Sequence, residues 1–195
     1  MERGKALQIV NQYVKNQSLI NHMLSVEAVM HYYAEKENAD VDLWGITGLL
    51  HDFDWEIHPT PEQHPSEGAP ILRDLDVPEV IIKAILSHGS LAGFSRETRM
   101  EKALFACDEI TGLVTAVALV RPSRSLYDLE ASSVKKKWKD KAFAAGTNRE
   151  EMEKGAAEFG VPLWEHVDNV IHAMCRIASQ LNLEGNLSSP TVERL

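Results

Sequence analysis

Residues 47–55 constrain this chain more than any other stretch, because they place two polar side chains at the end of an apolar helical pattern. The segment reads Thr-Gly-Leu-Leu-His-Asp-Phe-Asp-Trp, so two leucines directly precede His51 and Asp52. A buried imidazole and carboxylate without partners would be costly, and a metal ion would remove that cost. Histidine and carboxylate ligands suit zinc, manganese, iron or magnesium better than copper(I), which prefers sulfur. The doublet therefore predicts a metal site with further ligands elsewhere.

The composition argues against several classes of partner. The 195-residue chain has a formal net charge of −9, whereas a nucleic-acid polymer or an anionic membrane needs a broad positive surface. A small phosphorylated substrate needs only a local positive site. The two cysteines, Cys107 and Cys175, lie in apolar helical patterns, which predicts free thiols and a cytoplasmic protein. We expect no signal peptide and no apolar run of membrane-spanning length, and the oligomeric state is left open.

Apolar residues recur at helical spacing along the chain, and we find no convincing strand pattern. The sequence therefore predicts an all-α fold. Three prolines between residues 54 and 65 predict a loop there, because proline removes a backbone donor. The expected helices cover approximately residues 7–16, 18–37, 40–50, 66–75, 78–88, 98–117, 129–141, 147–160 and 162–177.

Capping residues indicate where several of these helices begin, since short polar side chains accept hydrogen bonds from the free N–H groups of a first turn. The expected caps are Ser18, either Asp40 or Asp42, the capping box of Thr98 with Glu101, and the capping box of Thr147 with Glu150. With 44% hydrophobic residues, the helices can bury one core. We therefore expect a single domain over residues 1–184 and a disordered tail over residues 185–195.

Six histidines and aspartates at helix faces, helix ends or adjoining loops extend the doublet into a candidate ligand set. In chain order they are His22, His51, Asp52, His64, His88 and Asp108. This order resembles the HD superfamily of metal-dependent phosphohydrolases, whose signature is a histidine, a His-Asp doublet and a later aspartate. Residues 18–120 carry the similarity.

Two further segments resemble the HDIG-type subgroup of that superfamily. Residues 64–73, His-Pro-Ser-Glu-Gly-Ala-Pro-Ile-Leu-Arg, are similar to its second-histidine region, and residues 85–88, Ile-Leu-Ser-His, to its third. The doublet is followed by Phe53 and Asp54, where the subgroup usually has Ile and Gly. The resemblance to small HD-domain hydrolases implies an all-α helical bundle of the HD type, with a metal in a central cleft.

The resemblance also implies roles for single residues. A first divalent metal would have four ligands, namely His22, His51, Asp52 and Asp108. His64 and His88 would bind a second metal, with Asp52 bridging the two ions, or would contact substrate phosphate. Two ions can lower the pKa of a shared water and stabilise charge on the attacking and leaving oxygens.

The implied function is that of a metal-dependent phosphohydrolase acting on a small phosphate monoester, nucleotide or phosphodiester through a metal-activated water. The metal would be one or two ions of manganese, iron, zinc, magnesium, cobalt or nickel. Asp52, Asp54, His64 and His88 are the candidate catalytic residues. We find no nucleophile elbow and no P-loop pattern that would indicate another chemistry.

Other polar residues are candidates for supporting roles. Asp54 can orient a ligand imidazole or the nucleophilic water, whereas Glu56 more simply belongs to a solvated turn. Downstream, Arg121, Arg124 and Lys135 are candidates for binding substrate phosphate, although most of the lysines nearby are expected on a solvated helix face.

The remaining histidines and the tryptophan after the doublet have simpler interpretations. His31 lies about half a turn from His22 around the predicted helix, so we expect it to face solvent. All three remaining histidines, His31, His166 and His172, are expected at the surface or in helix packing. Trp55 either packs against the protein or stacks on a base, and packing is the simpler interpretation.

Two other functions are compatible with the same residues. Some HD-fold proteins are di-iron oxygenases with a similar six-ligand set, so the oxidative cleavage of a small alcohol or phosphonate is one alternative. A non-catalytic metal-binding sensor module is the other. The complete ligand set argues against a sensor, because a module without turnover has no need of an open site with many ligands.

Overall fold

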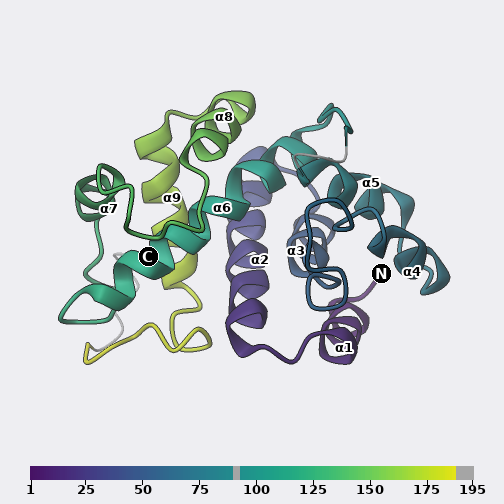
Figure 1. The fold of residues 1–195 in the computed structure, drawn as a ribbon, viewed down its shortest axis with the longest axis horizontal. Coiled ribbons are helices and arrows are strands. Elements are labelled where there is room, and N and C mark those ends of the chain that lie inside the picture. Colours follow the sequence, from purple (N-terminus) through teal and green to yellow (C-terminus); the bar gives the residue numbers. More distant parts are fainter. Residues whose placement is uncertain (90–92, 188–195) are drawn as a thin grey trace. The chain divides into compact units, whose positions relative to one another are not determined.

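The computed structural model describes residues 1–89 and 93–187, and it confirms the predicted all-α class (Figure 1). These residues form nine α-helices and include no β-strand. The helices are α1 (Arg3–Tyr13), α2 (Gln17–Glu37), α3 (Val41–Leu50), α4 (Gly68–Asp74), α5 (Glu79–His88), α6 (Arg99–Val120), α7 (Ala131–Trp138), α8 (Arg149–Phe159) and α9 (Leu163–Cys175).

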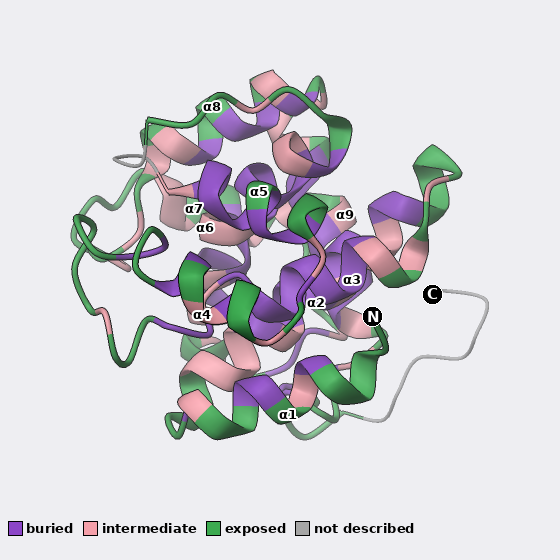
Figure 2. Cartoon of the chain, turned by 90° about the vertical axis from the view of Figure 1, so that its right-hand side faces the viewer, coloured by how far each residue is buried: buried purple, intermediate pink, exposed green. Residues whose placement is uncertain are grey.

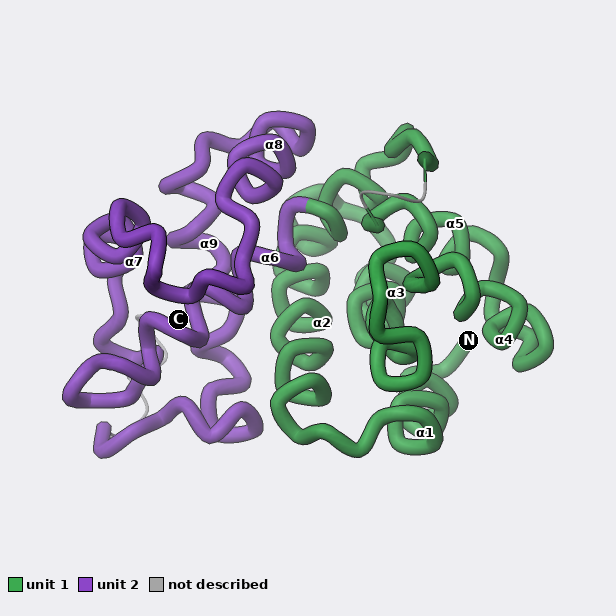
Figure 3. The backbone as a smooth tube through the Cα atoms, in the orientation of Figure 1, with its two compact units in different colours: residues 1–105 green, residues 106–195 purple. Residues whose placement is uncertain are grey.

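The chain divides into two compact units, residues 1–105 and residues 106–195 (Figure 3). The division falls within α6, which continues from one unit into the other without a break. The single domain expected over residues 1–184 stays a prediction. Of the expected tail, residues 185–187 lie in a turn and a bend, and residues 188–195 lie outside the described residues.

Helix α3 lies deep in unit 1, and glycines let it approach α2 closely. Its residues from Trp44 to Leu50 are all buried (Figure 2). A Cβ atom added at Gly48 would lie 3.0 Å from the backbone of Val26, and one added at Gly45 would overlap the imidazole of His31. His31 does not simply face solvent: the residue is half-buried, and its ring packs where a glycine on α3 lacks a side chain. Helix packing is the other role expected for it.

The structure confirms two of the predicted helix starts. Asp40 accepts a hydrogen bond at 2.9 Å from the backbone N–H of the third residue of α3. Before α6, the Thr98 hydroxyl accepts a hydrogen bond from the Glu101 N–H at 3.2 Å, and the Glu101 carboxylate accepts one from the Thr98 N–H at 2.8 Å. This reciprocal pair is the capping box that the spacing predicts.

Two other predicted caps are wrong by one or two residues. Asn16, and not Ser18, caps α2, because its side-chain oxygen accepts a hydrogen bond from the Ser18 N–H at 2.8 Å. Asn148, and not Thr147, caps α8 and accepts hydrogen bonds from two N–H groups of its first turn. Asparagine is as good a cap as serine or threonine, so the choice between neighbouring candidates depends on the path of the preceding chain.

Helix α6 corrects the expectation that no apolar run is long enough to span a membrane. It has 22 residues and meets the length and composition of a membrane-spanning helix. However, 61% of its most apolar stretch is buried within the protein. A buried helix of a protein core meets the same criteria, so the absence of a membrane partner stays a prediction.

In unit 2, α9 packs against α7 and α8. The rings of Trp138 and Trp164 meet edge to face, with centroids 5.4 Å apart. His166 is completely buried, and its Nε2–H donates a hydrogen bond to the carbonyl oxygen of Ala106 at 2.8 Å. This residue is therefore a packing residue of the core, one of the two roles expected for it.

Candidate metal centre

The His51-Asp52 doublet directly follows α3, whose buried leucines carry it into the interior of unit 1. His51 is completely buried, and its Nδ1–H donates a hydrogen bond to the Gly48 carbonyl at 2.7 Å. In a neutral ring this contact leaves the lone pair on Nε2, which lies 3.4 Å from the Asp52 carboxylate. The end of the helix thus fixes the orientation of the imidazole.

Two more histidines have the same orientation. His88, the last residue of α5, uses its Nδ1–H to donate to the Ile85 carbonyl at 2.5 Å. His64, in the loop before α4, uses its Nδ1–H to donate to Oδ1 of Asp54 at 2.8 Å. Both rings are buried, and both turn Nε2 toward Asp52. Fixing the δ nitrogen in this way is the usual means by which proteins orient a metal-binding histidine.

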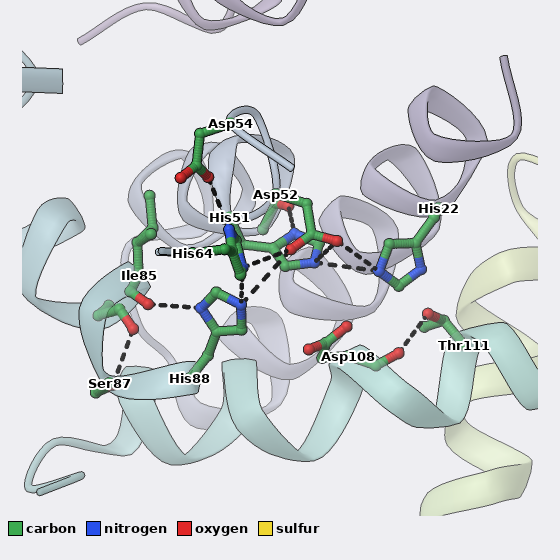
Figure 4. Close-up of polar contacts among 12 residues, drawn as sticks. His22, His51, Asp52, Asp54, His64, Ile85, Ser87, His88, Asp108 and Thr111 are labelled. Carbon is green, nitrogen blue, oxygen red and sulfur yellow. Dashed lines mark hydrogen bonds and ion pairs between the residues drawn. The ribbon is translucent and has the colours of Figure 1, made fainter. Parts of the chain in front are cut away.

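The carboxylate of Asp52 lies between two pairs of histidines (Figure 4). Its Oδ2 lies 3.5 Å from Nε2 of His22 and 3.4 Å from Nε2 of His51. Its Oδ1 lies 3.2 Å from Nε2 of His64 and 3.6 Å from Nε2 of His88. Each carboxylate oxygen therefore faces a different histidine pair, which is the arrangement of a carboxylate able to bridge two ions.

The ring nitrogens within each pair are close together. Nε2 of His22 lies 3.1 Å from Nε2 of His51, and the same distance separates Nε2 of His64 from Nε2 of His88. Two bare lone pairs would repel at this distance, so each pair needs a shared proton or a cation. Nitrogen ligands about 2.1 Å from a metal in tetrahedral or octahedral geometry lie about 3.0–3.4 Å apart. The donor set and its spacing thus fit a divalent metal.

The electrostatics favour a cation as well. Burial disfavours a charged Asp52, but His51, His64 and His88 outweigh it and hold the pKa of this carboxyl well below its usual range. Burial also disfavours a charged His64, yet hydrogen bonds to Asp52 and Asp54 raise its pKa to about 9. Without metal, the cluster therefore keeps a proton on His64 at neutral pH, and a divalent ion would take over its role.

Asp108 belongs to unit 2, three residues beyond the division in α6. The Thr111 hydroxyl donates a hydrogen bond to its backbone carbonyl at 2.8 Å, which is a local contact within the helix. Next to it, Cys107 is fully buried, and this burial raises the pKa of its thiol well above the usual value. The role of Asp108 as the fourth ligand stays a prediction.

The predicted phosphate-binding residues also lie in unit 2, where two of them have partners on neighbouring side chains. Arg121 forms an ion pair with Asp128, with 2.8 Å between Nη2 and Oδ2. The ammonium of Lys135 lies 5.2 Å from the ring centroid of Trp164. Arg124 is exposed and has a positive φ of 50°. Their roles as substrate contacts stay predictions.

Glu56 and Trp55, which follow the doublet in the chain, both make contacts within unit 1. The Glu56 carboxylate accepts hydrogen bonds from the backbone N–H groups of Lys15 and Asn16, at 3.0 and 2.6 Å. It therefore fastens the loop to the connection between α1 and α2, which the sequence did not indicate. The indole of Trp55 meets the imidazole of His64 edge to face, with centroids 5.0 Å apart, but the residue is exposed. Whether it only packs or also stacks on a base stays a prediction.

A helical fold with a half-buried carboxylate between paired histidines defines a class of all-α proteins with a site placed to hold divalent metal. The family model of the HD domain matches residues 19–109, and this part of the chain is accordingly an HD domain. The matched range includes all six predicted ligands, Asp108 among them. The HDIG-type subgroup stays a prediction. No curated protein matches the chain.

Proposed function

We propose that this protein is a metal-dependent phosphohydrolase acting on a small phosphate monoester, nucleotide or phosphodiester. One observation carries the proposal, namely that the two oxygens of Asp52 face two separate histidine pairs. A single structural metal needs only one closed set of four ligands, so a two-sided carboxylate would be superfluous there. Two neighbouring ions are the usual arrangement for displacing groups at phosphorus.

The side chains would have distinct roles in this reaction. Asp52 would hold both ions with its two oxygens, and the pairs His22–His51 and His64–His88 would complete the two sides. Bound metal would supply the positive charge that lowers the pKa of a water and stabilises the phosphoryl oxygens. The buried rings of His51, His64 and His88 keep bulk water from one side of the site, which strengthens these interactions.

We assign Asp108 to the side of His22 and His51. Its support is that the HD-domain match ends at residue 109 and that α6 runs unbroken from buried residues of unit 1 to Asp108. Arg121, Arg124 and Lys135 remain our candidates for binding the substrate phosphate.

The test is hydrolysis by the protein loaded with Mn²⁺, assayed on p-nitrophenyl phosphate, bis-p-nitrophenyl phosphate, nucleoside monophosphates and cyclic nucleotides. We expect turnover of at least one of these substrates and a loss of at least about a hundredfold in Asp52→Ala. Asp74→Ala, at an exposed position on α4, is the control and should keep the activity. Metal-loaded protein that cleaves no phosphate ester would leave only the sensor or the oxygenase.

The second candidate is an HD-fold di-iron oxygenase acting on a small alcohol or phosphonate. The observation in its favour is the nitrogen-rich donor set, with four histidines around one carboxylate, because imidazole suits iron well. Iron in the protein as purified, together with a substrate-induced spectral change that requires oxygen, would favour this chemistry over hydrolysis.

A further inference from the structure

Asp54 differs from the other groups that orient the histidines. His51 and His88 donate their Nδ1–H to backbone carbonyls, but His64 donates to a carboxylate oxygen, Oδ1 of Asp54, at 2.8 Å. A hydrogen bond to a charged acceptor is about twice as strong as one between neutral groups. Of the three rings, that of His64 is therefore held by a carboxylate, Asp54, and not by a backbone carbonyl.

The carboxylate of Asp54 is enclosed by the protein. The residue is completely buried, and its Oδ2 has no hydrogen-bond partner among the described residues. A Cβ atom added at Gly68, the first residue of α4, would overlap this oxygen. The bare backbone of a glycine thus forms one wall of the space that Oδ2 occupies.

A buried carboxylate with one free oxygen is unfavourable for folding, and an apolar side chain of similar size would avoid that cost. Among the described residues, the imidazole of His64 is the side-chain group that contacts this carboxylate. Its ring has Asp54 on the Nδ1 side and Asp52 on the Nε2 side, at 2.8 and 3.2 Å. The negative charge of Asp54 therefore acts through the imidazole of His64 on whatever its Nε2 faces, on the side of Asp52.

We propose that Asp54 is a positioning residue that holds His64 with Nε2 turned toward Asp52 and His88, and that the glycine at position 68 is required for this. The inference rests on the proposed metal site and assigns the Asp54–His64 pair to the ion on the His88 side. A carboxylate behind a histidine ligand fixes the ring and makes its other nitrogen a stronger donor. Loss of such a group typically weakens metal binding about 10–100-fold.

The first experiment measures Mn²⁺ binding to the whole chain by calorimetry, with the number of bound ions checked by elemental analysis. Asp54→Asn keeps the size of the side chain and an oxygen for the His64 N–H, but it removes the charge. We expect one class of Mn²⁺ sites to weaken about 10–100-fold while the other keeps its affinity. Asp74→Asn makes the same change at an exposed residue and should bind Mn²⁺ like the wild type.

A double variant separates positioning from a general structural role. If Asp54 acts only through the ring, then Asp54→Asn combined with His64→Ala should bind Mn²⁺ no more weakly than His64→Ala alone. Additive losses would mean that Asp54 influences binding by another route, and they would overturn the proposal.

Gly68→Ala tests the space behind Asp54 without changing a charged group. The added methyl should displace the carboxylate and weaken the same class of Mn²⁺ sites. Gly4→Ala, on α1, is the matched control, because nothing lies within 4 Å of a Cβ atom added there. Thermal unfolding of each variant shows whether binding is measured on folded protein.

The outcomes distinguish this inference from the proposed function. Folded Asp54→Asn protein that binds Mn²⁺ like the wild type would overturn the inference and leave the hydrolase proposal intact. Wild-type protein that binds Mn²⁺ and hydrolyses nothing would count against the hydrolase alone. Wild-type protein that binds no Mn²⁺ would overturn both.

Discussion

The pKa of a buried histidine is shifted in opposite directions in the two units of this protein. In unit 1, His64 lies between two carboxylates, and its pKa is raised to about 9 in spite of its burial. In unit 2, burial lowers the pKa of His166 to about 4, and its hydrogen bond to the Ala106 carbonyl only partly offsets the loss of water. Burial alone therefore does not determine the charge of a histidine, and the neighbouring carboxylates decide it.

The largest expected effect comes from removing the charge at the centre of the histidine cluster. In Asp52→Asn, both histidine pairs lose the carboxylate that faces them, so Mn²⁺ binding should weaken about a thousandfold, or about 4 kcal/mol. His64 should then become less basic and more like His166, which NMR titration of the metal-free protein can measure. Mn²⁺ binding that stays within about tenfold of the wild type would show that Asp52 is no ligand.

The next effect concerns His166 and the stability of the protein in acid. Its folded pKa of about 4 lies below the unfolded value of 6.5, so the unfolded state binds more protons between these values. The contribution of neutral His166 to the free energy of unfolding is fully present above pH 6.5. About 3 kcal/mol of it is lost as the pH falls toward 4. In urea unfolding at pH 7, 5.5 and 4, the free energy of unfolding should fall less with decreasing pH in His166→Gln than in the wild type. Glutamine keeps an N–H donor but does not titrate.

Equal acid sensitivity of the wild type and His166→Gln would contradict this interpretation of His166. It would mean that His166 is accessible to protons in the folded protein and that the contrast with His64 does not hold.

The smallest effect is the pH dependence of metal binding at the histidine cluster. Below pH 9, Mn²⁺ has to displace a proton from His64, because the pKa of this ring is raised to about 9. The affinity of the His64 side should therefore rise about tenfold per pH unit, or about 1.4 kcal/mol, between pH 7 and 9 and level off above. Calorimetry in two buffers of different ionisation enthalpy measures the released proton. Binding without proton release would show that His64 is neutral in the metal-free protein.

Local patterns in the sequence determined the helical class, most helix positions and the candidate ligands. Helical spacing of apolar residues and the Thr98–Glu101 capping box depend only on neighbours a few positions apart, so the sequence shows them directly. The His51-Asp52 doublet was similarly recognisable, because an imidazole and a carboxylate at the end of an apolar helix need a partner.

The resemblance grouped the candidate ligands, but only the tertiary structure decided how their side chains are oriented and which other groups contact them. Asp54 and His64 are ten residues apart, and His64 and His88 are 24 apart, so no periodicity predicts that both rings turn Nε2 toward one carboxylate. Which of the two expected roles, surface or packing, applies to His31 and to His166 depends on contacts of the same kind. Contacts between distant segments depend on how the helices pack, and the protonation of each histidine follows from those contacts.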